Sequence, residues 1–168
     1  MTYNIIYICY MEINLKSDEY FMNQAIEEAK KALDLDEVPV GAVIVCDNQI
    51  IARGYNYVEH LNDVTAHAEM QAFTAAADYL GGKYLKKCTL YVTLEPCTMC
   101  AGAISLARLR RLYYAAGDPK TGAVDNGVAF FDQSSCHHKP EIYGGILETQ
   151  SAELLKRFFL MRRNSPSF

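Results

Sequence analysis

The chain has 168 residues, 51% of them hydrophobic, and a formal net charge of −4. This length and apolar content suffice for one globular domain with a substantial core. The net negative charge argues against a general nucleic-acid-binding protein. The charge is uneven, since residues 1–50 carry nine acidic and three basic side chains and the rest of the chain sums to +2. A polyanionic partner is therefore expected to contact the later part of the chain.

The first ten residues are apolar but lack the basic start and the Ala-x-Ala-like cleavage site of a secretory signal. They are also too few to span a bilayer, so we expect a cytoplasmic protein that does not contact a membrane. Met11 can itself serve as an initiator, and the first convincing element begins near Ser17. Residues 1–16 are predicted to be a loose tail or a start-site artefact, and residues 17–168 a single domain.

The first predicted helix begins at Ser17. Asp18 and Glu19 follow it, and a hydroxyl N-cap before acidic residues is typical of a helix start because both complement the positive end of the helix dipole. Apolar residues at helical spacing through Leu33 predict one amphipathic helix. Its polar face is expected to be solvated and comprises Glu27, Glu28, Lys30 and Lys31.

A β-hairpin is predicted next. Residues 40–46 and 49–55 are rich in β-forming side chains, and Asp47 and Asn48 between them tolerate the left-handed conformations of a tight turn. Residues 56–64 are predicted to form a polar loop that leads to the first chemical motif.

That motif is Thr65-Ala66-His67-Ala68-Glu69. Apolar residues continue at helical spacing to Ala77, so His67 and Glu69 are expected in the first turn of a helix that ends near Gly81-Gly82. The two side chains then point in distinct directions, so that one can bind a metal ion while the other approaches water and substrate.

The second motif follows a predicted strand at residues 89–93 and reads Pro96-Cys97-Thr98-Met99-Cys100. Pro96 suits the first turn of a helix, where its missing N–H costs nothing, and this helix is predicted to run to about Leu106. The i, i+3 spacing of Cys97 and Cys100 directs both sulfur atoms at one point. A further strand at residues 111–115 completes a strand–helix–strand unit, for which a right-handed parallel crossover is expected.

The rest of the chain begins with a turn-rich loop at residues 117–122 and a weakly patterned stretch to Pro140. Residues 141–143 are predicted to form a short final strand. From about Ser151 the helical spacing of apolar residues predicts a terminal helix with the basic side chains Lys156, Arg157, Arg162 and Arg163.

Together the motifs supply one imidazole, two thiolates and a spare carboxylate. His67, Cys97 and Cys100 are ligand types that zinc prefers, and three protein ligands leave the fourth tetrahedral position open for water. A structural zinc site would need a fourth firm ligand, and no ligand spacing is evident for Cys88, Cys136, His60, His137 and His138. A catalytic zinc site is therefore favoured over structural zinc and over a redox dithiol.

Glu69 is expected to carry protons and not to bind the metal. Because zinc lowers the pKa of water to roughly 7, this carboxylate can accept a proton from the water and pass it to a ring nitrogen of the substrate. It would then help to protonate the departing ammonia. The predicted chemistry is hydrolytic deamination at an amidine-like carbon.

The H-x-E…P-C-x-x-C pattern is similar to that of the zinc-dependent cytidine deaminase superfamily. The chain more closely resembles the bacterial tRNA adenosine deaminases within that superfamily. Nearly all of the chain after Ser17 contributes, through residues 37–43, 54–56, 65–69, 90–97, 99–103, 118, 120–123, 158–159 and 161–163.

The resemblance implies a three-layer α/β/α fold with a mixed five-stranded sheet flanked by helices, as one zinc-dependent deaminase domain and usually a homodimer. It implies one Zn²⁺ per chain, held by His67, Cys97 and Cys100, with Glu69 as the catalytic residue. The implied reaction converts adenosine to inosine at the wobble position of a tRNA anticodon, so the expected partner is the anticodon stem-loop of tRNA.

The same resemblance implies which residues bind the substrate. Asn56 matches an asparagine that contacts the target nucleotide, and the loop around Asp118 resembles one that lies along the RNA. The terminal helix resembles one that holds the anticodon loop, although two aromatic residues on it are equally compatible with the core. The implied substrate-binding set is Asn56, Ala68, Leu94, Pro96, Asp118, Lys120, Phe158, Phe159 and Arg162.

The sequence departs from the family pattern at Val64, where a proline is common, and at residues 104–108, which often carry a histidine. Residues 125–140 match poorly, which bears on the tRNA or base that is accepted. The alternative enzyme is a deaminase of a free base or nucleoside, guanine or cytosine, which the acidic net charge favours. The basic terminal helix and Lys120-Thr121-Gly122 favour tRNA. A zinc-stabilised RNA-binding subunit is a non-enzymatic alternative, against which Glu69 argues.

Overall fold

The structure, a computed structural model, describes residues 16–164, so the predicted N-terminal tail lies outside the described residues except for its last residue. Within these residues, no helix is both long and apolar enough to cross a membrane. The elements in chain order are α2 (Asp18–Asp34), β1 (Gly41–Cys46), β2 (Gln49–Tyr55), α3 (Val58–Leu61), α4 (Ala68–Leu80), β3 (Cys88–Leu94), α5 (Thr98–Leu106), β4 (Arg111–Ala116), η1 (Phe130–Asp132), β5 (Glu141–Gly144) and α6 (Glu148–Asn164).

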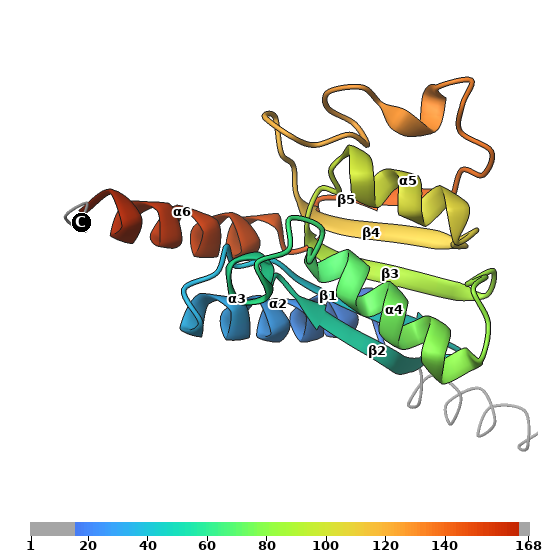
Figure 1. Cartoon of the computed structure of the whole chain (residues 1–168), viewed down its shortest axis with the longest axis horizontal. Coiled ribbons are helices and arrows are strands. Elements are labelled where there is room, and N and C mark those ends of the chain that lie inside the picture. The colour runs from blue at the N-terminus through green and yellow to red at the C-terminus, as the bar shows by residue number, and fades with distance from the viewer. Residues whose placement is uncertain (1–15, 165–168) are drawn as a thin grey trace, which may run out of the picture.

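The strands form one five-stranded sheet in the order β2-β1-β3-β4-β5 (Figure 1). Strand β1 pairs antiparallel with both β2 and β3, whereas β3, β4 and β5 run parallel. The mixed five-stranded sheet is therefore confirmed, as is the parallel pairing of the two strands that α5 connects.

Each face of the sheet carries its own hydrophobic core because side chains alternate along a strand. Ala42 and Ile44 of β1 belong to the core beneath α4 and α5, and Val43 and Val45 belong to the core beneath α2. Figure 1 shows α4 and α5 lying across one face of the sheet. The three-layer α/β/α arrangement is confirmed.

The predicted element boundaries hold within a few residues at most places. Ser17 caps α2, with its hydroxyl oxygen accepting a hydrogen bond from Tyr20 N at 3.1 Å. Asp47 and Asn48 both have positive φ values, as the predicted hairpin turn requires. The loop prediction for residues 56–64 is wrong at α3, because a four-residue helix is too short to produce a periodic sequence pattern. Helix α6 begins at Glu148, slightly before the predicted start.

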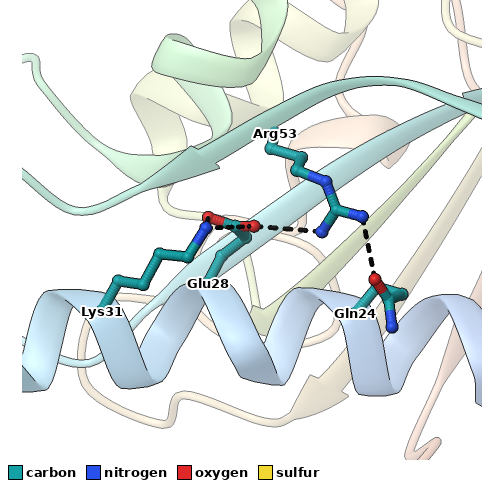
Figure 2. Close-up of polar contacts among 4 residues, drawn as sticks. All are labelled: Gln24, Glu28, Lys31 and Arg53. Carbon is teal, nitrogen blue, oxygen red and sulfur yellow. Dashed lines mark hydrogen bonds and ion pairs between the residues drawn. The ribbon is translucent and has the colours of Figure 1, made fainter.

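The expectation of a fully solvated polar face on α2 is wrong for Glu28, which is 2% exposed. Figure 2 shows its carboxylate between Lys31, one helical turn away, and Arg53 of β2. The Arg53 guanidinium also donates to Gln24 Oε1 at 2.8 Å. A buried carboxylate needs such partners, so this acid fastens α2 to β2.

Candidate active site

His67 is the N-cap of α4 and has an extended backbone, with ψ at 156°. The prediction that it lies in the first helical turn is therefore wrong by one position, since sequence periodicity does not resolve helix ends at this precision. Glu69 does lie in the first turn, where a negative charge complements the helix dipole.

Cys97 occupies the equivalent N-cap position of α5, and Cys100 lies in the first turn of that helix. Pro96 precedes the N-cap, so its predicted place inside the helix is also wrong. The two cysteines nevertheless converge. Cys97 Sγ lies 3.7 Å and Cys100 Sγ 3.6 Å from His67 Nδ1.

The spacing of these atoms fits zinc. Bonds of about 2.3 Å to sulfur and about 2.1 Å to nitrogen at tetrahedral angles place the two ligand atoms about 3.6 Å apart. All three ligand atoms lie within 4.8 Å of one another, and no other cluster of three or more His, Cys, Asp or Glu residues with this geometry occurs among residues 16–164. The donor set and its geometry both suit a zinc site with one open position.

The two thiols differ in acidity. Hydrogen bonds from the Cys100 thiol and from His67 lower the pKa of Cys97 to about 4. The pKa of Cys100 is raised, because its thiol donates to Cys97 and is buried. The hydrogen bonds of the ligand group thus favour the thiolate form of Cys97 over that of Cys100, and zinc binds cysteine as the thiolate.

A cavity of about 720 Å³ opens beside the ligand group and is lined by His67, Cys97 and Glu69. This volume is in the usual range for a small-molecule site. Glu69 is 4% exposed, and burial raises the pKa of its carboxyl. A raised pKa suits a group that takes up and releases protons near neutral pH.

Most of the residues expected to bind substrate line this cavity: Asn56, Leu94, Asp118, Lys120, Phe158, Phe159 and Arg162. Ala68 and Pro96 are buried and are not among its lining residues. The two aromatic residues of α6 differ, since Phe158 is 4% exposed and Phe159 is 50% exposed. Phe158 is therefore a core residue at the cavity edge, and Phe159 has a free surface.

Arg162 is held over the Phe158 ring, with its guanidinium carbon 5.3 Å from the ring centroid. It also forms an ion pair with Asp36, at 3.1 Å between Nη2 and Oδ2, and the same nitrogen donates to the Asp36 carbonyl oxygen. These contacts fix the last turns of α6 against the loop that follows α2.

Glu37 was not predicted as a site residue, but it is 1% exposed and lines the cavity. Its Oε2 accepts from Asn56 Nδ2 at 3.1 Å, and its Oε1 accepts from His60 N at 3.0 Å. Because the Asn56 amide nitrogen is engaged, its orientation is fixed. The available sequence signal was an acidic residue directly before the apolar Val38-Pro39-Val40 run.

Asp118 is held by its own loop. Its Oδ1 accepts from the N–H groups of Lys120 and Thr121, and its Oδ2 accepts from the Thr121 hydroxyl. Burial opposes ionisation of Asp118, but these hydrogen bonds outweigh it and keep its pKa below the usual value. The loop therefore has one preferred conformation at the cavity wall.

The sequence profile of the cytidine and deoxycytidylate deaminase zinc-binding region matches residues 15–116, which include all three metal ligands and Glu69. His67, Cys97 and Cys100 are thus the zinc-binding group of a deaminase.

Comparison with known sequences shows which deaminases this chain resembles. A tRNA-specific adenosine deaminase of Agrobacterium fabrum is 56% identical over 144 residues, which cover 86% of this chain and 95% of that protein. The tRNA-specific adenosine deaminase of Rickettsia typhi is 46% identical over 146 residues, covering 86% and 99%. The chain belongs to the cytidine and deoxycytidylate deaminase family, and within it to the group of the tRNA-specific adenosine deaminases.

Two solved structures of deaminases are similar to this chain in sequence and fold. A structure from work on A-to-I editing by tRNA:A34 deaminases at the wobble position has a TM-score of 0.80 and 57% identity, covering 81% of this chain and 99% of that one. A guanine deaminase from Bacillus subtilis has a TM-score of 0.61 and 33% identity, covering 91% and 98%.

Proposed function

We propose that this chain is a hydrolytic deaminase that converts adenosine to inosine at the wobble position of a tRNA anticodon. The observation that carries the proposal is the 56% identity to a tRNA-specific adenosine deaminase over 86% of the chain. The zinc-binding group beside a cavity that Glu69 lines supports the same reaction.

Zinc, when bound, supplies Lewis acidity that makes water a nucleophile at neutral pH. Glu69 accepts a proton from this water and delivers it to a ring nitrogen of adenine as oxygen adds to the carbon that bears the amino group. The carboxylate then takes the proton of the newly added hydroxyl and gives it to the amino nitrogen, so that the carbon–nitrogen bond breaks, a carbonyl forms and ammonia leaves. Water and adenosine are thus converted to inosine and ammonia, with Glu69 restored.

The cavity is lined by polar, aromatic and basic side chains that suit the binding of an RNA nucleotide. The Asn56 side chain is held by Glu37 and lines the cavity, so we expect its remaining polar groups to contact the base. The exposed ring of Phe159 offers a stacking surface, and the exposed Lys120 offers a charge for phosphate. We expect the anticodon loop of tRNA to contact these side chains.

Residues 17–168 are proposed to act as a single deaminase domain, supported by one continuous sheet with a core on each face. The family resemblance supports a homodimer. Light scattering of the purified protein would then give twice the 18.9 kDa chain mass, and a monomeric mass would contradict the dimer.

The function is tested with a tRNA anticodon stem-loop that carries adenosine at the wobble position. Wild type is expected to release ammonia and form inosine. Glu69→Gln, which keeps the size of the side chain but cannot accept the proton, should lower kcat by roughly 10²–10⁴-fold while zinc content stays unchanged. Glu27→Gln is the matched control, because Glu27 lies on α2 and pairs with Lys30 in solvent.

The second candidate is a free-base deaminase, which the 33% identity to a guanine deaminase structure favours. The higher identities to tRNA-specific enzymes favour tRNA. Turnover of guanine or cytosine, with the stem-loop left unchanged by the wild type, would reverse this order.

A further inference from the structure

Glu95 is a buried acid at the end of β3, directly before the Pro96-Cys97 segment that carries a zinc ligand. Its side chain is 2% exposed and belongs to the cavity lining. A buried carboxylate without partners would be strongly unfavourable, so its hydrogen bonds reveal its role.

Those hydrogen bonds come from both ends of one loop, residues 117–126. At the start of the loop, Asp118 N donates to Glu95 Oε2 at 2.9 Å. At its end, three successive N–H groups donate to Oε1 at 2.9–3.0 Å, from Val124, Asp125 and Asn126. Asn126 Nδ2 also donates to Oε2, at 2.6 Å.

Five donors fill the acceptor capacity of one carboxylate, which has about four lone-pair sites. The negative charge is balanced by the dipoles of consecutive backbone N–H groups, as in other anion-binding nests. Glu95 therefore has no acceptor left for water or substrate, which distinguishes it from Glu69.

The loop also packs against the metal-ligand segment. Gly122 lies so close to the carboxylate that an added Cβ would be 2.5 Å from Glu95 Cδ. Ala123 N donates to Pro96 O at 2.9 Å, and Gly122 forms a β-bridge with Cys97. Asp118 at the anchored start of the loop, and Lys120 and Thr121 after it, all line the cavity.

We propose that Glu95 is a positioning residue for the substrate: by fastening both ends of the 117–126 loop, it holds the cavity wall in the conformation that receives the nucleotide. It sets the affinity for RNA and leaves the chemical step to Glu69 and the zinc site. This inference rests on the proposed function, because the ligand concerned is the tRNA anticodon loop.

The test is Glu95→Gln in the full, zinc-loaded chain. Glutamine has the same shape as glutamate, but an NH₂ group replaces one of the two accepting oxygens. This NH₂ group faces an N–H donor of the loop, so at least one hydrogen bond is lost. KM for the anticodon stem-loop is expected to rise about tenfold or more, with kcat within about twofold of wild type and an unchanged zinc content. Backbone amides of residues 117–126 should exchange faster with deuterium, whether or not RNA is present.

Three further variants sharpen the result. Asn126→Ala removes one of the five hydrogen bonds and should raise KM less than Glu95→Gln does, which provides a milder variant if the latter folds poorly. In Glu95→Gln/Asn126→Asp the new amide can donate to the new carboxylate, so KM and exchange should return toward the wild-type values. Glu27→Gln should change neither quantity.

The proposal is overturned if Glu95→Gln leaves both KM and the exchange of the loop unchanged. It is also overturned if kcat falls with KM constant, or if zinc is lost, since Glu95 would then serve the chemistry or the metal ligands. A wild type that does not deaminate the stem-loop refutes the proposed function, whereas the exchange comparison still decides whether Glu95 holds the loop.

Discussion

At the residue scale, three buried glutamates line the cavity, and each has a different role because each has different hydrogen-bond partners. Glu37 orients the Asn56 amide, whereas the Glu95 carboxylate accepts hydrogen bonds from backbone N–H groups. Glu69 has a raised pKa because of its burial, and it lies in the first turn of the helix whose N-cap is the zinc ligand His67. In the proposed function, the same side-chain type therefore orients a residue that contacts the base, holds a loop and transfers protons, depending on its environment.

The lowered pKa of Asp118 predicts how its contribution to folding stability changes at acid pH. Its folded-state pKa lies below the usual value, so its ionised form stabilises the native loop above the unfolded pKa of about 3.9. That contribution is lost as the pH falls through the lower, folded-state pKa. We expect the difference in unfolding free energy between wild type and Asp118→Asn to be constant from pH 7 to about 5 and to shrink below about pH 4. Urea unfolding across this range measures it, and a difference that grows on acidification would contradict the assignment.

At the element scale, the sheet order brings the two chemical motifs together. Strands β2 and β3 both pair antiparallel with β1, so they run in the same direction and end at the same edge of the sheet. The helices with His67 and Cys97 as N-caps both begin at that edge. Their first turns therefore meet, with backbone N–H groups and positive dipole ends near the thiolates.

Because Gly54 of β2 has no side chain, the first turns of α4 can pack closely against the end of this strand. A Cβ at this position would be 2.2 Å from Ala68 O and 2.7 Å from Ala72 N of α4. Gly54→Ala is expected to push α4 away, lowering the unfolding free energy by about 1–3 kcal/mol and weakening zinc binding through displacement of His67. Chemical denaturation and zinc titration measure both effects.

Gly102 provides the matched control. It lies in α5, and an added Cβ there would have no atom within 4 Å. Gly102→Ala should raise stability by up to about 1 kcal/mol, because alanine favours a helix over glycine. Equal effects of the two substitutions would show that the contact with α4 does not matter.

At the scale of the whole molecule, the zinc site joins two helices whose ligand positions are 30 and 33 residues apart in sequence. A ligand that binds only the folded chain stabilises it by mass action, by about 2.7 kcal/mol at a hundredfold excess over Kd. Chelation of zinc should therefore lower Tm by about 5–10 °C. Differential scanning fluorimetry should show recovery when zinc is restored.

A Cys97→Ser variant is the control for this measurement, because a serine hydroxyl is a poor zinc ligand. Its Tm should already be low and should respond little to the chelator. Tm values of wild type that do not change on chelation would indicate that the metal contributes to chemistry but not to stability.

The sequence determined the elements with regular periodicity, because burying one apolar face requires that spacing. It also determined the metal ligands, since His67, Cys97 and Cys100 lie in short motifs whose residue types suit zinc. The N-cap positions of His67 and Cys97 were missed by one or two residues, because periodicity alone does not define where the backbone leaves the helix.

Only the tertiary structure decided the partners of the buried acids. Glu28 meets Arg53 across 25 residues, and Glu95 meets Asn126 across 31 residues. Nothing local in the sequence marks such pairs, because the order and direction of the strands bring them together. The same holds for Phe158 and Phe159, adjacent in sequence, of which the docking of α6 buries one and exposes the other. The motifs specify the zinc chemistry, and the packing of loops and helices around the sheet shapes the cavity in which it acts.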